Sequence, residues 1–159
     1  MATHRLLSPL HQAAAIQPDA PAYRIGERTI SYQTLSQQVV AVGEQLVKVG
    51  LLSGDRVACI AYNQPELLSL YWACVDNGLL FCPISPRFAQ TQLIELIKTH
   101  QYRYCWLDST ASNSPASQIA LSAELTSVTQ QLNLDFSQRS GKVAKIVDPS
   151  QGVNAILTS

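Results

Sequence analysis

The sequence contains no apolar run that approaches the roughly 20 residues needed by a membrane-spanning helix. Residues 1–20 lack the long apolar core and cleavage site of a secretory signal. Eleven basic residues balance eleven acidic ones, and no stretch is rich in lysine or arginine. A nucleic-acid-binding role therefore has no electrostatic support. The composition favours one globular, cytoplasmic domain without a membrane span.

Cysteine pairs at redox or metal-binding spacing are also absent. The four cysteines form no CxxC motif: Cys59, Cys74, Cys82 and Cys105. Most have apolar neighbours in expected strands, which indicates buried thiols in a reducing compartment. No metal site is predicted, because the histidines have no partner at ligand spacing. They are interpreted as surface or helix-end residues: His4, His11 and His100.

The centre of the chain carries one strand–helix–strand pattern, within residues 54–87. Two apolar runs, 57–61 and 79–84, lack polar alternation, as parallel strands do when helices cover both faces of their sheet. A helix is expected between them. Pro65 suits its first turn, and Gly78 suits the left-handed position just past its end. This unit predicts an α/β domain.

The N-terminal third predicts two helices and a hairpin. A short helix is expected over residues 5–17 and a small hairpin over 22–30. Apolar residues then recur at spacings of 4, 3, 4 and 3, which predicts a helix over 32–49 with Ser31 as its cap. Only two heptads are present, so a core-facing helix is favoured over a coiled-coil seam.

Residues after the central unit continue the alternation, with a helix over 89–99 and a strand over 103–107. The predicted fold is a doubly wound, mostly parallel α/β sheet with flanking helices and right-handed crossovers. Polar residues near the strand ends are interpreted as structural. Asp55 is a turn residue, and Asn63 and Glu66 serve the N-terminus of the central helix.

The last third is more polar. A loop is expected over 108–120, a brief helix over 121–128, a half-buried strand over 132–136 and a final strand over 153–157. A parallel strand at a chain end lacks its covering helix. We therefore expect residues 1–159 to be a fragment of a larger domain. Its exposed apolar edge should favour self-association, for example as a homo-oligomer.

Several short motifs identify a family by their order along the chain. They are Ser31-Tyr32-x-x-Leu35, Gly54-Asp55-Arg56-Val57, Asn63-x-Pro65-Glu66, Gly78, Pro83-x-Ser85-Pro86-Arg87 and Ala155-Ile156-Leu157-Thr158-Ser159. Each occurs widely alone, but the ordered set resembles the N-terminal portion of the AMP-forming acyl-CoA synthetases, the adenylate-forming ligases. The similarity extends from about Leu10 to Ser159.

The resemblance implies an enzyme that activates a carboxylic acid with ATP and Mg²⁺ to an acyl-adenylate and transfers the acyl group to CoA. In this family the final strand leads into a phosphate loop rich in Ser, Thr and Gly. The resemblance thus assigns Thr158 and Ser159 to the ATP phosphates, and Arg87 to the phosphates of CoA. It assigns no catalytic residue within the chain and places the acyl pocket beyond residue 159.

Within the family, the short N-terminus, Leu157 and residues 83–96 are most similar to o-succinylbenzoate–CoA ligases of bacterial menaquinone biosynthesis. Two features depart from the family pattern: Ser85 replaces a common Asn, and residues 108–150 do not align. The chain alone is expected to lack ligase activity. Two alternatives stay open: a small stand-alone flavodoxin-like binding module, and an adenylating enzyme that loads a carrier protein.

Overall fold

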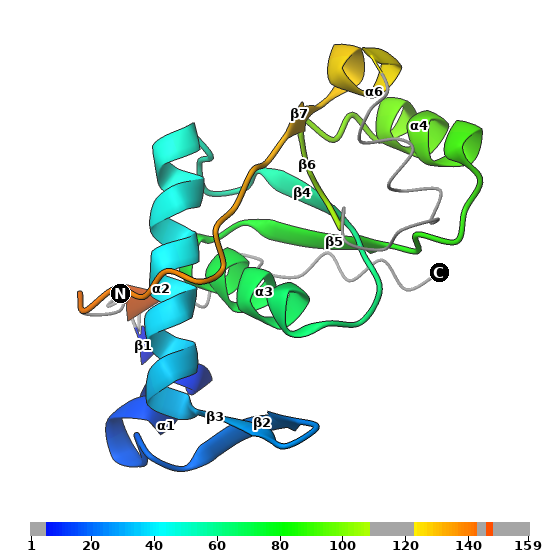
Figure 1. The fold of residues 1–159 in the computed structure, drawn as a ribbon. Coiled ribbons are helices and arrows are strands. Elements are labelled where there is room, and N and C mark those ends of the chain that lie inside the picture. Colours follow the sequence, from blue (N-terminus) through cyan, green and yellow to red (C-terminus); the bar gives the residue numbers. More distant parts are fainter. Residues whose placement is uncertain (1–5, 109–122, 143–145, 148–159) are drawn as a thin grey trace.

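The computed structural model describes residues 6–108, 123–142 and 146–147 (Figure 1). Its centre is a four-stranded parallel sheet in the order β5-β4-β6-β7. The strands are β4 (Arg56–Ile60), β5 (Leu80–Ile84), β6 (Tyr104–Leu107) and β7 (Gln130–Gln131). Helices cover both faces of this sheet (Figure 1). The predicted doubly wound, mostly parallel α/β fold is confirmed.

The sheet separates two apolar cores, because alternate residues of β4 face opposite sides. Val57 and Cys59 join one cluster, and Ala58 and Ile60 join the other. The first cluster is covered by α2 (Tyr32–Val49) and α3 (Pro65–Asn77). The second is covered by α4 (Gln90–Thr99) and α6 (Ala123–Val128). Each helix thereby buries its apolar face against the sheet.

Helix α2 has the bounds that its apolar spacing predicts. The Ser31 side chain accepts a hydrogen bond from the backbone N–H of Thr34 at 3.2 Å, so the predicted cap is formed. Gly50 ends the helix with φ 112°, a left-handed conformation that costs glycine little.

Helix α3 begins at Pro65, with Glu66 in its first turn, and ends at Gly78 with φ 66°, as predicted. The prediction that Asn63 caps this helix is wrong. Pro65 takes the first helical position, so the extended residue before it, Gln64, is the cap residue. The Asn63 side chain therefore lies one position too early.

The N-terminal helix is shorter than predicted. Helix α1 spans Pro9–Ile16, and the preceding residues form a strand, β1 (Leu6–Leu7), which pairs antiparallel with β8 (Ile146–Val147). Ser8 has an extended conformation, as a residue before proline prefers. The helix therefore cannot begin before Pro9. The predicted hairpin is present as β2 (Pro21–Ile25) and β3 (Arg28–Ser31).

The strand predicted over residues 132–136 is wrong in position. The parallel pairing to β6 occurs at β7, and it extends only to a hydrogen bond from the Leu132 N–H to the Cys105 carbonyl at 2.8 Å. The predicted alternation does describe burial, since Leu132, Leu134 and Phe136 pack on the first core. Except for Asp108, the predicted loop over 108–120 lies outside the described residues.

All four cysteines are free and buried, as their apolar neighbours indicated. Burial raises the pKa of the Cys105 thiol to about 12. Within the described ranges, no helix combines the length and the apolar character that crossing a membrane would require.

Candidate active site

The carboxyl ends of the parallel strands lie at one edge of the sheet, here called the carboxyl edge. β4 connects through α3 to β5 on one side, and the chain then returns through α4 to β6 on the other side. The switch point of this α/β sheet is therefore between β4 and β6, where such sheets bind ligands. The Asp108 N–H donates to the Ile60 carbonyl at 3.0 Å and ties the two strand ends together.

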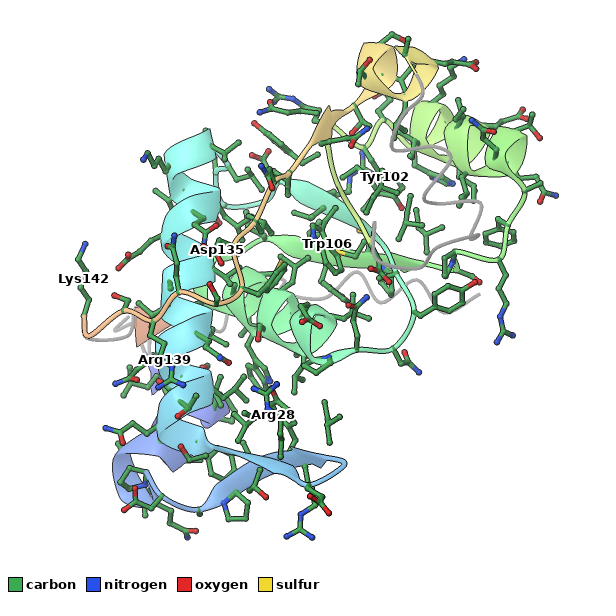
Figure 2. All side chains as sticks on the ribbon, in the orientation of Figure 1. Arg28, Tyr102, Trp106, Asp135, Arg139 and Lys142 are labelled. Atoms are coloured by element: carbon green, nitrogen blue, oxygen red, sulfur yellow. The ribbon has the colours of Figure 1, made fainter. Side chains whose placement is uncertain are left out.

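A cavity of about 460 Å³ opens at the end of β6. One of its walls is the start of α3, and another is the chain that leaves β7. Its lining residues are Gln64, Glu66, Trp106, Leu107, Asp108, Gln131, Leu132, Asn133, Leu134 and Phe136. The Trp106 ring packs edge-to-face on Phe136, with 5.2 Å between the ring centroids. Figure 2 shows Trp106 beside the central strands. This cavity is the candidate site in the described part of the chain.

The charge of this cavity does not suit the triphosphate of ATP. Glu66 and Asp108 contribute carboxylates, whereas its described lining includes no Lys, Arg or His. Phosphate oxygens would be repelled by these carboxylates, since phosphate sites use cations and backbone N–H groups. The described residues thus form a wall of the carboxyl edge but supply no phosphate cradle.

Arg87 follows β5, so it lies beyond the same carboxyl edge. It is exposed, and its backbone N–H donates to the Ser85 hydroxyl at 3.3 Å. It does not line the cavity at β6. Thr158, Ser159 and the predicted strand over 153–157 lie outside the described residues.

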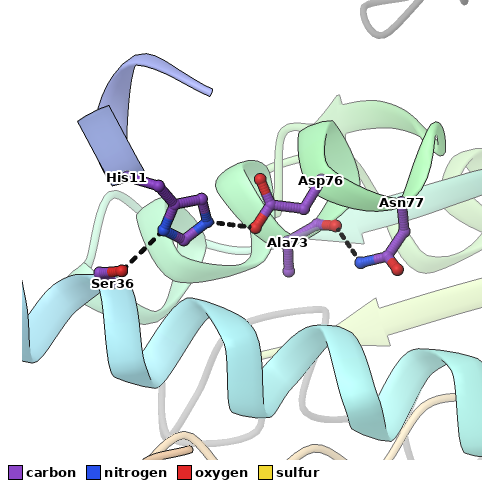
Figure 3. A network of polar contacts seen from close by, with 5 residues as sticks. All are labelled: His11, Ser36, Ala73, Asp76 and Asn77. Carbon is purple, nitrogen blue, oxygen red and sulfur yellow. Dashed lines mark hydrogen bonds and ion pairs between the residues drawn. The ribbon is translucent and has the colours of Figure 1, made fainter. Parts of the chain in front are cut away.

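A buried polar network joins the first three helices (Figure 3). His11 of α1 contacts the Ser36 hydroxyl through Nδ1 at 2.7 Å and the Asp76 carboxylate through Nε2 at 2.5 Å. The interpretation of His11 as a surface or helix-end residue is wrong, because it is only 3% exposed. His100, in contrast, does occupy the end of α4.

The sequence did contain a signal for the burial of His11. On a helix, residues 11 and 14 lie on the same face because they are three positions apart, and residue 14 is the apolar Ala14. The residue types resemble a hydrolytic triad, but neither Ser36 nor His11 lines a described cavity. We interpret the network as structural, since it connects α1 to α2 and α3. Nor do the described residues include a cluster of three potential metal ligands.

Residues 10–159 match the model of the AMP-binding enzyme family. The chain belongs to this family. This match confirms the predicted resemblance to the adenylate-forming ligases. The matched residues include the strands of the central sheet and the residues at its carboxyl edge.

Among the relatives of this AMP-binding enzyme chain, an indoleacetate–CoA ligase of Aromatoleum aromaticum is 33% identical over 84 residues, which are 53% of this chain and 16% of the relative. A 2-succinylbenzoate–CoA ligase of Salmonella typhimurium is 27% identical over 89 residues, 56% of this chain and 20% of the relative.

Solved structures of other proteins share the fold. A variant of E. coli MenE with bound OSB-AMS has a TM-score of 0.71 at 18% identity, covering 97% of this chain and 31% of MenE. The nonribosomal peptide synthetase FmoA3 in its AMPPNP-bound form has a TM-score of 0.76 at 19% identity, covering 100% of this chain and 17% of FmoA3. The AMP-binding enzyme chain thus spans between 16% and 31% of the length of these four proteins.

Proposed function

We propose that this chain is the N-terminal subdomain, residues 1–159, of an ATP-dependent, AMP-forming acid–thiol ligase. The observation that carries the proposal is the family match over residues 10–159, together with acid–CoA ligases among the relatives. In the proposed reaction, a carboxylate oxygen attacks the α-phosphorus of ATP and pyrophosphate leaves. The CoA thiol then attacks the acyl carbon, and AMP leaves.

The phosphate cradle in this proposal consists of Thr158 and Ser159 with the residues that follow them. Their hydroxyls and backbone N–H groups can donate to phosphate oxygens. Charge-assisted hydrogen bonds of this kind contribute roughly 1.5–3 kcal/mol each. The acidic cavity at β6 supports placing the phosphates at Thr158 and Ser159, because its carboxylates disfavour phosphate binding in the cavity itself. Mg²⁺ is included as the counter-ion of ATP, and no described residue is assigned to it.

For the acid, we propose o-succinylbenzoate, which would place the enzyme in menaquinone biosynthesis in the cytoplasm. The 2-succinylbenzoate–CoA ligases among the relatives and MenE among the similar structures support this choice. An indoleacetate–CoA ligase and feruloyl-CoA synthases also match. What all these proteins share, by their names, is an aromatic carboxylic acid.

A second candidate is an adenylating enzyme that loads a carrier protein instead of CoA. The likeness to FmoA3, a nonribosomal peptide synthetase, favours it. The two candidates share the adenylation half-reaction and differ only in the thiol that accepts the acyl group.

A two-stage assay of the full-length protein tests both candidates. Acid-dependent exchange of pyrophosphate into ATP is measured with o-succinylbenzoate, feruloate, indoleacetate, benzoate and a fatty acid. The thioester is then identified with CoA or with a carrier protein as acceptor. We expect the strongest exchange with o-succinylbenzoate and a CoA thioester. Exchange with none of these acids would overturn the proposed function. Preference for another acid would overturn only the proposal that o-succinylbenzoate is the substrate.

A further inference from the structure

A second cavity, of about 300 Å³, lies between the hairpin β2–β3, α2 and the first turns of α3. We call it the hairpin cavity. Its lining residues are Tyr23, Ile25, Arg28, Ile30, Gln38, Pro65, Glu66, Ser69, Phe136 and Ser137. The volume is at the lower end of the range for small-molecule pockets, about 300–1,000 Å³. Glu66 and Phe136 also line the cavity at β6, so the two cavities are neighbours.

The hairpin cavity carries one group of each charge, and the two do not pair. Arg28 comes from β3 and Glu66 from the first turn of α3. Among the described residues neither side chain forms an ion pair or a side-chain hydrogen bond. Figure 2 shows Arg28 in the space between the hairpin and α3. A guanidinium without a partner suits a carboxylate, and a carboxylate without a partner suits an ammonium group.

Tyr23 lines the same cavity as these two charges. Burial raises the pKa of the Tyr23 hydroxyl most, Glu66 raises it further, and Arg28 lowers it. A tyrosine hydroxyl is protonated at neutral pH, so it can donate a hydrogen bond to a carboxylate.

Hydroxyls and apolar side chains complete the walls. Ser69, from the second turn of α3, is only 4% exposed, and Gln38 adds an amide. Ile30 and Phe136 are partly buried against the first core and present apolar surface to the same space. A ligand that fits these walls has a small charged head and a short apolar body.

We propose that the hairpin cavity binds a free α-amino acid with an apolar side chain. Arg28 holds the ligand carboxylate, Glu66 holds the ammonium group, and Phe136 and Ile30 contact the side chain. Amino-acid binding at this cavity does not depend on the proposed function. Phe136 packs on Trp106, so occupancy also changes the surroundings of Trp106 at the carboxyl edge.

Calorimetric titration of the full chain with L-leucine and L-phenylalanine tests the proposal. Isocaproate lacks the amine of leucine, and isoamylamine lacks its carboxylate. Each should bind at least about tenfold more weakly than leucine, because each loses one charge-assisted contact. No binding of either amino acid up to about 10 mM would overturn the proposal. Binding of isocaproate as tight as that of leucine would also overturn the proposal, because a site that binds only a carboxylate has no need of Glu66.

Charge-neutral variants assign the two contacts. Arg28→Gln and Glu66→Gln should each weaken leucine binding at least about tenfold, with Arg28→Gln leaving isoamylamine binding unchanged. Arg24→Gln is the matched control, since Arg24 is exposed on β2 of the same hairpin and does not line the cavity. Unfolding midpoints show that the variants are folded. Leucine binding that is equal in Arg28→Gln and Arg24→Gln would overturn the assignment.

Discussion

His11 Nε2 lies 2.5 Å from Asp76 Oδ2, although 65 positions separate the two residues in the chain. Both side chains are nearly inaccessible, at 2% and 5% exposure. Among the described residues, the second carboxylate oxygen of Asp76 has no hydrogen-bond partner. Its contact with His11 is therefore what offsets the burial of the carboxylate, and it fastens α1 to α3.

Replacing His11 with alanine should strongly destabilise the fold. The substitution leaves Asp76 buried without a partner, and breaking a buried pair in this way costs roughly 3–5 kcal/mol. The free energy of unfolding in urea measures the effect. His100→Ala is the control, because His100 is exposed at the end of α4 and its loss should change stability by less than about 0.5 kcal/mol. Equal losses in the two variants would contradict the structural role of His11.

Local sequence patterns correctly predicted the helix boundaries that a few neighbouring residues specify. The spacing of apolar residues in α2, the Ser31 cap and the glycine stop at Gly78 each act within a few residues, and all three are formed. The order of these elements then indicated the sheet and the carboxyl edge, because parallel strands with short crossovers allow few arrangements.

The features that were missed depend on contacts between distant parts of the chain. Leu6–Leu7 became a strand because Ile146–Val147 is its partner, and no local pattern shows that partner. The contact between His11 and Asp76 is of the same kind. Residues 132–136 alternate as a strand would, yet alternation records burial only and does not specify a pairing partner. Glu66 and Asp108 likewise came to line one cavity only through folding.

The stability of the protein should fall as the pH rises from about 8.5 to about 12. Burial raises the pKa of the cysteine thiols, to about 12 for Cys105, and that of the Tyr102 hydroxyl to about 12. In this window the native state keeps protons that the unfolded state, with thiol pKa values of about 8.5, loses. Alkaline pH therefore favours unfolding.

Urea midpoints at pH 8 and pH 10 measure this effect. Cys105→Ala removes one of the buried thiols, so its midpoint should fall less between these pH values than that of the wild type. An unchanged midpoint in the wild type would show that the thiols ionise with similar pKa values in both states.

Gly43 of α2 and Asn77 of α3 should be energetically coupled. A Cβ atom at Gly43 would lie 2.7 Å from Nδ2 of Asn77, which donates to the Ala73 carbonyl at 2.7 Å. Glycine to alanine within a helix usually stabilises by about 0.5–1 kcal/mol. Here the contact should cancel that gain in Gly43→Ala.

A double-mutant cycle with Asn77→Ala isolates the coupling. In the Asn77→Ala background the alanine at position 43 meets no amide, so it should stabilise by the usual amount. We expect a coupling of at least about 0.5 kcal/mol from urea unfolding. The same effect of Gly43→Ala in both backgrounds would mean that the Asn77 amide moves aside without cost.

Arg87 provides the test of the proposed CoA contact. Arg87→Ala in the full-length protein should raise the KM for CoA about tenfold or more, because a guanidinium–phosphate contact contributes roughly 1.5–3 kcal/mol. Acid-dependent pyrophosphate exchange should not change, since CoA takes no part in that half-reaction. Arg103→Ala is the matched control: Arg103 is also exposed, but it precedes β6 and lies at the opposite edge of the sheet. Equal KM values for CoA in the two variants would remove Arg87 from the proposed site, while loss of exchange in Arg87→Ala would assign it to the adenylation step instead.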